Sequence, residues 1–132
     1  MAETVVVAFG GNAVLRAGQA GTLEDQRRNI RAMARELATL VAEGHRLVVV
    51  HGNGPQVGML QLQQELAAPE IPAQPLFISG AMTQGQLGYL IQEGLQNALA
   101  ARGLEREVAA LVSRAQSTSS NGRRCAPWST RG

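Results

Sequence analysis

Residues 4–12 read TVVVAFGGN and residues 46–54 read RLVVVHGNG, and these two stretches decide the fold. Each is a short run of mostly β-branched, apolar residues that ends abruptly in glycine and asparagine. Such runs are typical of buried strands in a parallel sheet, whose faces are covered by helices. We therefore predict strands over residues 4–9 and 46–51, each ending at a glycine-rich turn.

A helix is predicted between these two strands. Thr22 offers a capping hydroxyl, and the carboxylates of Glu24 and Asp25 follow it. Apolar residues then recur at helical spacing as far as Gly44, a suitable helix end: Ile30, Met33, Ala34, Leu37, Leu40 and Val41. Strand, glycine turn, helix and strand together predict a right-handed βαβ unit.

Two more helices are expected in the middle of the chain. Residues 56–66 form the first, because the preceding proline is tolerated in a first helical turn. Three prolines make residues 67–75 a connecting loop. The second helix carries the apolar stripe within residues 87–99, and Ser79 or Thr83 is its expected N-cap.

The end of the chain divides into two parts. Glu107 to Val112 predicts a third strand, so the repeating elements give an α/β layered sandwich with a mainly parallel sheet over residues 1–112. Residues 113–132 are rich in Ser, Thr and Arg and have no periodic apolar pattern, which predicts a disordered tail. This tail is either an ordinary basic terminus or an unnatural one, which arises from out-of-frame translation or an altered gene end.

Composition excludes several classes of function. The 132 residues suit one domain, and a net charge of +2 is too small to indicate nucleic-acid binding. No apolar stretch is long enough for a membrane span and no signal segment is evident, so we expect a cytoplasmic protein. All 12 basic residues are Arg. Any phosphoryl chemistry would therefore have to proceed without a lysine of this chain.

Six residues at the two turns form a candidate site for phosphate or another oxyanion: Gly10, Gly11, Asn12, Gly52, Asn53 and Gly54. Glycine leaves main-chain N–H groups unblocked and accepts the positive φ found in anion-binding nests. The carboxyl ends of parallel strands share one sheet edge, so the turns should form one cleft. The second turn opens into a helix, whose N-terminus favours negative charge, and the asparagines add neutral donors.

Less specific interpretations of the same residues stay open. Each Gly-rich turn could be a tight turn only, and each Asn could cap its own turn. His51 could donate a proton, contact substrate, or only hydrogen-bond to the backbone at a strand end. We assign no catalytic residue and no metal site, because His45 and Cys125 lack metal-ligand spacing.

The sequence resembles the carbamate kinases of the amino acid kinase superfamily. The resemblance is carried by residues 5–13, VVVAFGGNA, and by residues 51–58, HGNGPQVG. Residues 24–29 and 81–89 also fit the family's pattern. It extends over about residues 4–112 and covers the N-terminal part of the longer family sequence.

The resemblance implies a three-layer α/β/α sandwich and the reaction of ATP with carbamate to give ADP and carbamoyl phosphate, or the reverse, during arginine breakdown. By position, residues 10–12 would line the phosphoryl site and residues 52–54 the carbamate site. In such enzymes a C-terminal domain holds Mg-ATP, and the subunits form homodimers.

The chain lacks the later part of this pattern, including a lysine that approaches the phosphoryl group and the nucleotide pocket. We therefore expect a truncated carbamate kinase that is inactive or nearly so by itself. Two alternatives remain: a non-catalytic product that pairs with an intact subunit, and a small anion-binding α/β module.

Overall fold

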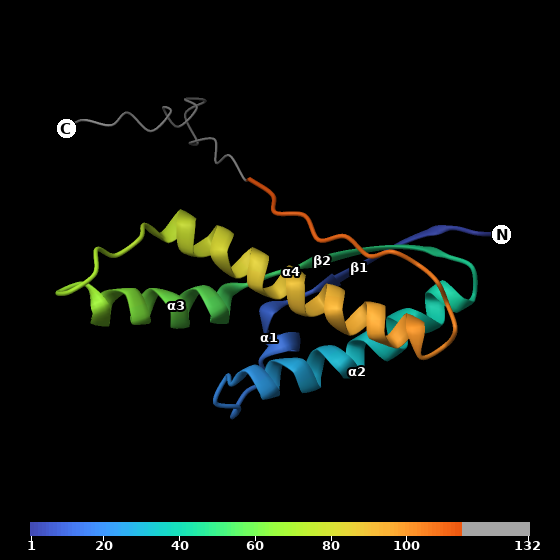
Figure 1. Ribbon diagram of the computed structural model, residues 1–132, viewed down its shortest axis with the longest axis horizontal. Coiled ribbons are helices and arrows are strands. Elements are labelled where there is room, and N and C mark those ends of the chain that lie inside the picture. Colours follow the sequence, from blue (N-terminus) through green and yellow to red (C-terminus); the bar gives the residue numbers. More distant parts are fainter. Residues whose placement is uncertain (115–132) are drawn as a thin grey trace.

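The computed structural model of the protein describes residues 1–114, which form two strands and four helices (Figure 1). The elements follow in the order β1 (Thr4–Phe9), α1 (Gly11–Val14), α2 (Leu23–Ala42), β2 (Arg46–His51), α3 (Gly54–Ala67) and α4 (Leu76–Ala100). The first two of the three predicted strands and all three predicted helices are present. The four-residue helix α1 is an addition, because the sequence predicts only a glycine turn there.

Strands β1 and β2 pair in parallel, with Thr4 opposite Arg46 and Phe9 opposite His51. Helix α2 connects them, so the predicted βαβ unit is confirmed. The register brings both strands to an end at the same level. The two glycine turns therefore begin side by side at one sheet edge.

Helix α2 begins and ends as its sequence predicts. Thr22 is the N-cap: its Oγ1 accepts from the main-chain N–H of Asp25 at 3.1 Å, and the Asp25 carboxylate accepts from the main-chain N–H of Thr22 at 3.2 Å. This reciprocal pair satisfies two donors that a helix start leaves free. At the other end Gly44 has a φ of +92°, which a residue with a side chain adopts only with strain.

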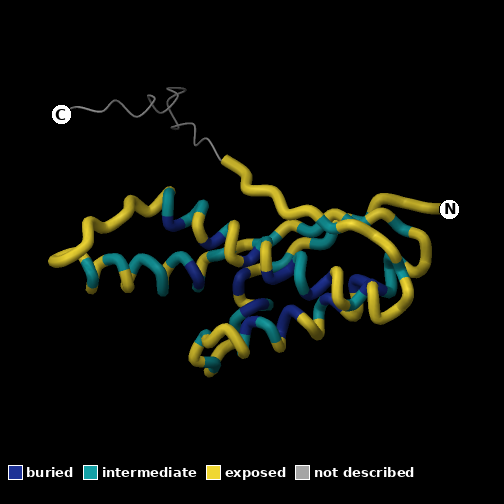
Figure 2. Tube along the Cα trace, in the orientation of Figure 1, coloured by how far each residue is buried: buried dark blue, intermediate teal, exposed yellow. Residues whose placement is uncertain are grey.

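Helices α2 and α4 pack against each other and form most of the core (Figure 2). They approach closely at Gly94, where an added Cβ would lie 2.8 Å from Ile30 Cγ2. Arg27 and Glu93 join the two helices at the surface by a two-pronged ion pair, with distances of 3.1 and 3.2 Å. This crossing fixes the position of α4 relative to the βαβ unit.

The start of α4 differs from its prediction. The helix begins at Leu76, with Pro75 as N-cap and no side-chain cap. Neither Ser79 nor Thr83 caps it, so that prediction is wrong. Both side chains are buried within the helix, and their hydroxyls bond to groups of α3, of the turn before it and of α4 itself. Tertiary packing rather than capping therefore accounts for these two residues.

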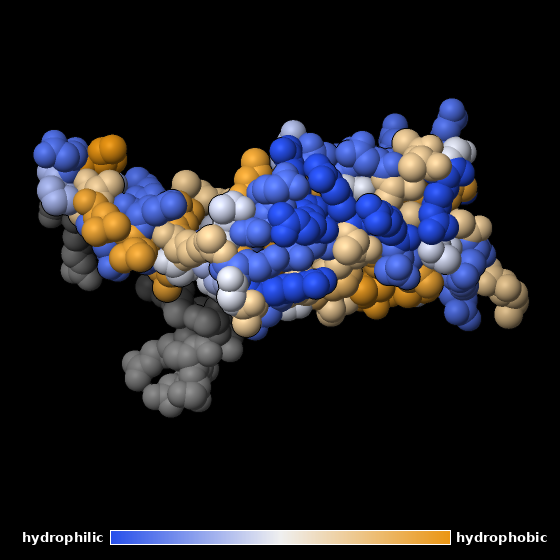
Figure 3. All heavy atoms as spheres, turned by 90° about the horizontal axis from the view of Figure 1, so that it is seen from below, coloured by the Kyte–Doolittle hydropathy of each residue, from blue (hydrophilic) through white to orange (hydrophobic). Residues whose placement is uncertain are grey.

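The sheet is covered on one face within the described residues. Alternate residues of the strands, such as Val7 and Val49, pack against α2 and α4. On the other face Val6, Val48 and Val50 are about half exposed or more. More apolar side chains are exposed toward the α3–α4 turn: Leu62, Leu66, Ile71, Leu76 and Phe77. Figure 3 shows hydrophobic atoms at the surface of this end of the molecule.

The predicted third strand over Glu107–Val112 is wrong, because this segment is irregular. The main chain here bonds to α4 instead of β2: within the segment Gln92 Nε2 donates to Val108 O at 2.8 Å, and directly after it Gln84 Oε1 accepts from Ser113 N at 2.9 Å. An open cavity of about 530 Å³ lies between the segment and β2. The separation leaves no ladder of hydrogen bonds to β2, and without one an apolar run is not a strand.

Two remaining predictions concern the ends and the membrane. From residue 115 onward the predicted disordered tail lies outside the described residues. No helix within residues 1–114 is both long enough and apolar enough to cross a membrane.

Candidate functional site

The two glycine turns touch each other at the carboxyl ends of β1 and β2. Gly52 N donates to Phe9 O at 2.8 Å, which extends the strand pairing by one hydrogen bond into the turns. Beyond it Gly11 lies against the start of α3: a Cβ added there would be 2.6 Å from Pro55 Cδ and 3.3 Å from Gly54 N. Gly11 is therefore required for close approach. The structure brings the two predicted halves of the site together.

The reason for glycine differs from the one that the sequence suggests. The described glycines with positive φ are Gly18, Gly21, Gly44 and Gly103, none of which lies in the two turns. Gly10 is extended, with a φ of −71° and a ψ of 155°. The expectation that these turns need positive φ is wrong, and the close contact between the turns explains at least Gly11.

Main-chain donors remain available at these turns. The N–H groups of Gly11, Asn12, Asn53 and Gly54 donate to no described residue. A helix start leaves such groups without a partner, and the dipole of a helix as long as α3 adds positive potential there. Gly10, Asn12, Gly52 and Gly54 are exposed. An oxyanion could thus reach neutral donors from both turns.

The side chain of Asn53 points to α4. Its Nδ2 donates to Gly80 O at 3.0 Å and to Thr83 Oγ1 at 2.9 Å, so both N–H groups of the amide are occupied. The alternative that Asn53 caps its own turn is wrong, because it makes no side-chain cap bond. Its amide ties the second turn to α4. The main-chain N–H of Asn53, and not its side chain, is therefore the group that can donate to an anion.

Two amides of α2 hold the chain between α1 and α2, one at the end of α1 and the other at Gly21. Asn29 Nδ2 donates to Val14 O at 2.9 Å, at the end of α1, and to Gln19 Oε1 at 2.7 Å. Gln26 Nε2 donates to Gly21 O at 3.1 Å. Both α2 residues are buried. The sequence signal for them was polar residues at positions three apart on the inward face of a helix.

Gln56 is a buried residue of the site that sequence reasoning missed. It is 2% exposed, and neither Oε1 nor Nε2 has a partner among the described residues. Its Oε1 would lie 3.3 Å from a Cβ on Gly11, so the carboxamide sits at the contact between the two turns. The available signal was a polar side chain in the first turn of a helix that begins at a candidate site.

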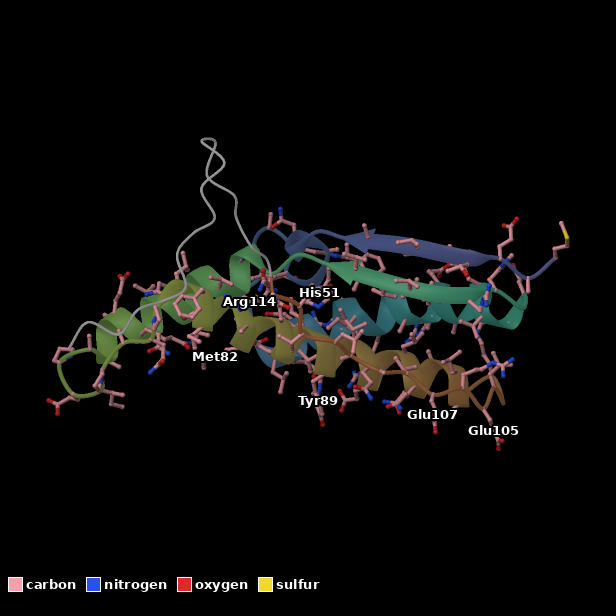
Figure 4. All side chains as sticks on the ribbon, turned by 90° about the horizontal axis from the view of Figure 1, so that it is seen from above. His51, Met82, Tyr89, Glu105, Glu107 and Arg114 are labelled. Carbon is pink, nitrogen blue, oxygen red and sulfur yellow. The ribbon has the colours of Figure 1, made fainter. Side chains whose placement is uncertain are left out.

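His51 lies directly before the second turn. It ends β2 and lines the cavity beside that strand, and its Nδ1 is 3.4 Å from Gly52 O (Figure 4). This contact agrees with the interpretation of His51 as a strand-end residue bonded to the backbone. Within residues 1–114 no group of three or more His, Cys, Asp or Glu side chains could hold a metal ion.

Comparison with known sequences identifies the family. The sequence profile of the amino acid kinase family matches residues 3–123. The chain belongs to the amino acid kinase family. Within that family it is 45% identical over 114 residues to the carbamate kinase of Pyrococcus horikoshii and 48% identical over 113 residues to that of Thermococcus kodakarensis. These matches cover 85% and 83% of this chain.

The fold of this amino acid kinase chain is shared with a solved relative. Carbamate kinase from Giardia lamblia bound to AMP-PNP superposes with a TM-score of 0.76 at 39% identity, over 80% of this chain and 37% of that one. The chain spans about 36% of the length of the archaeal relatives. The predicted fold class and the resemblance to carbamate kinases are confirmed.

Proposed function

We propose that residues 1–112 are the carbamate and phosphoryl-binding part of a carbamate kinase-type phosphotransferase, which interconverts ATP and carbamate with ADP and carbamoyl phosphate. The observation that carries the proposal is the contact of Gly11 with Gly54 and Pro55, which joins two sets of unpaired main-chain donors. The carbamate kinase relatives support the choice of substrate. An arginine-degrading role in the cytoplasm is part of the proposal.

Each turn has a role in this proposal. Gly10, Gly11 and Asn12 hold the phosphoryl oxygens, while residues 52–54 hold the carbamate side. Phosphoryl transfer asks a protein mainly for positioning and for stabilisation of charge, and fixed main-chain N–H groups supply both. Because the donors are neutral, they bind the oxyanion without the counter-charge that a lysine would bring.

As part of this proposal we place the Mg-ATP site of the intact enzyme outside residues 1–114. The chain has no lysine, and residues 1–114 offer no cluster of acidic side chains suited to a metal. Mg-ATP would have to be held elsewhere in an intact enzyme. We therefore expect the 132-residue chain to bind carbamoyl phosphate without turnover.

The test is a titration of the 15N-labelled chain with carbamoyl phosphate and, separately, inorganic phosphate. We expect saturable shifts of the backbone N–H signals of Gly11, Asn53 and Gly54. Gly11→Ala should weaken binding at least about tenfold, because its Cβ collides with Pro55 and separates the turns. Gly58→Ala is the matched control, since a Cβ there meets open space.

The result that contradicts the proposal is equal binding by both alanine variants, or no saturable shift in the parent chain. A coupled assay of ATP formation from carbamoyl phosphate and ADP completes the test. Turnover by the 132-residue chain would contradict the expectation that the nucleotide is held outside these residues.

A second candidate function is a non-catalytic partner of an intact carbamate kinase subunit. It is favoured by the uncovered sheet face, on which Val6, Val48 and Val50 are exposed. Exposed apolar surface of this kind is typical of association surfaces. Size-exclusion chromatography of the purified chain with a purified full-length carbamate kinase tests it. Separate elution of the two proteins would exclude it.

A further inference from the structure

Gln56 stands apart from the other glutamines of α3. Gln61 Oε1 accepts from Ser79 Oγ at 3.2 Å, and Gln64 Oε1 accepts from Gln74 N at 3.0 Å. Gln63 is exposed to solvent. Gln56 alone among these four is buried without a partner at either end of its carboxamide.

A buried carboxamide without partners destabilises the chain in this state. Water is excluded from both polar atoms, and no protein group replaces it. Met has a similar length and would fill the same volume without this cost. The amide therefore lowers the stability of the fold, whereas an apolar residue at this position would raise it. A destabilising polar residue of this kind is typical of positions that interact with a ligand.

The location of the carboxamide indicates which ligand. Gln56 is the third residue of α3, the 14-residue helix that begins at Gly54. Its Oε1 faces Gly11 across the contact between the two turns. Small shifts of the main chain at Gly11 would bring peptide groups within hydrogen-bond distance of the amide. An oxyanion that binds the free N–H groups of the turns acts on the same peptides.

We propose that Gln56 is a positioning residue of the oxyanion site: its carboxamide pairs with the main chain of the first turn when a phosphoryl oxyanion is bound. This inference rests on the proposed function. The amide is buried without a partner in the structure, so a hydrogen bond that forms when the anion binds would offset this cost. That hydrogen bond adds to the affinity, because a ligand gains from any interaction that forms only in the bound state.

The experiment compares the parent chain with Gln56→Met and with the matched control Gln63→Met. The probe is inorganic phosphate, and two quantities are measured: the dissociation constant and the urea midpoint without phosphate. We expect Gln56→Met to unfold at higher urea than the parent while binding phosphate about tenfold more weakly, the value of one good hydrogen bond. Gln63→Met should match the parent in both.

Either quantity can overturn the inference. Parent-like phosphate binding by Gln56→Met would show that the amide plays no part in the site. A lower urea midpoint would show that the amide has a partner in the anion-free fold. Neither result bears on the proposed function, which is tested by whether Gly11→Ala weakens phosphate binding. If the parent chain binds no phosphate, both the proposed function and this inference fail.

A third measurement does not depend on the variant folding. The side-chain NH2 signals of Gln56 in the 15N-labelled parent chain should shift at saturating phosphate, while those of Gln63 stay in place. Unshifted Gln56 signals with shifted Gly11 and Gly54 signals would overturn the positioning role alone.

Discussion

The hydrogen bond between the Asn53 and Thr83 side chains should contribute measurably to the unfolding free energy. Thr83 is 1% exposed, and its Oγ1 accepts from Asn53 Nδ2 at 2.9 Å while donating to a carbonyl within α4. Thr83→Val keeps the shape and removes the hydroxyl. It leaves one partly buried N–H of Asn53 without its acceptor, which costs about 1 kcal/mol or more of unfolding free energy.

A double-mutant cycle separates the free energy of this hydrogen bond from that of the other interactions that each substitution removes. Asn53→Ala removes two bonds, to Gly80 O and to Thr83, and only the second is shared with Thr83→Val. We expect a coupling of about 1 kcal/mol between the two substitutions, since contacting partners couple by about 0.5–3 kcal/mol. The assay is urea unfolding of the four proteins, followed by circular dichroism.

The control cycle pairs Asn53→Ala with Thr39→Val. Thr39 also carries a bonded hydroxyl, which accepts from Arg102 Nη2 at 2.8 Å, but it lies in α2 and shares no partner with Asn53. Coupling in that cycle should be within the error of the measurement. Additive losses in the Asn53–Thr83 cycle would refute the conclusion that α4 holds the second turn through this bond.

Three further predictions concern packing and surface. Gly94→Ala places a Cβ 2.8 Å from Ile30 Cγ2 and should lower the unfolding free energy, measured by urea unfolding, by about 1–3 kcal/mol. Gly85→Ala is the control and should not lower it, because a Cβ at residue 85 meets open space. Val48→Lys on the uncovered sheet face should keep the unfolding free energy within about 0.5 kcal/mol of the parent value and should reduce binding of a hydrophobic dye. A large loss of unfolding free energy would mean that this face is covered. Arg27→Met should cost about 1 kcal/mol or less, because both side chains of its ion pair are about a third exposed, and a larger loss in urea unfolding would contradict this.

Elements with a strong local signal were predictable from sequence. The two strands have continuous β-branched runs, and α2 has both a capping box and an apolar stripe, so neighbours in sequence determine these structures. The common edge of the two glycine turns followed from parallel pairing alone. The turns can touch because Gly11 has no side chain that would collide with Pro55. This contact joins residues far apart in the sequence, so no local sequence pattern predicts it.

Contacts between distant residues contribute to each of the errors in the predicted elements. Residues 107–112 have the composition of a strand, but Val108 O and the following Ser113 N bond to glutamines of α4. Ser79 and Thr83 are good capping residues by type, yet helix packing buries them. Helix α1 was missed because two of its four residues are Gly and Asn, and its end depends on the bond from Asn29 to Val14 O.

The candidate site depends on polar ties from the two long helices as much as on its glycines. Asn29 of α2 holds the end of α1, and the Asn53 side chain is held by α4, so each turn is attached to a different helix. The two helices are in turn joined at the crossing beside Gly94. A shift at this crossing would move one set of donors relative to the other. The geometry that an oxyanion meets is therefore determined by the α2–α4 packing, and the lack of lysine makes that geometry more important, because mobile charge cannot compensate for misplaced neutral donors.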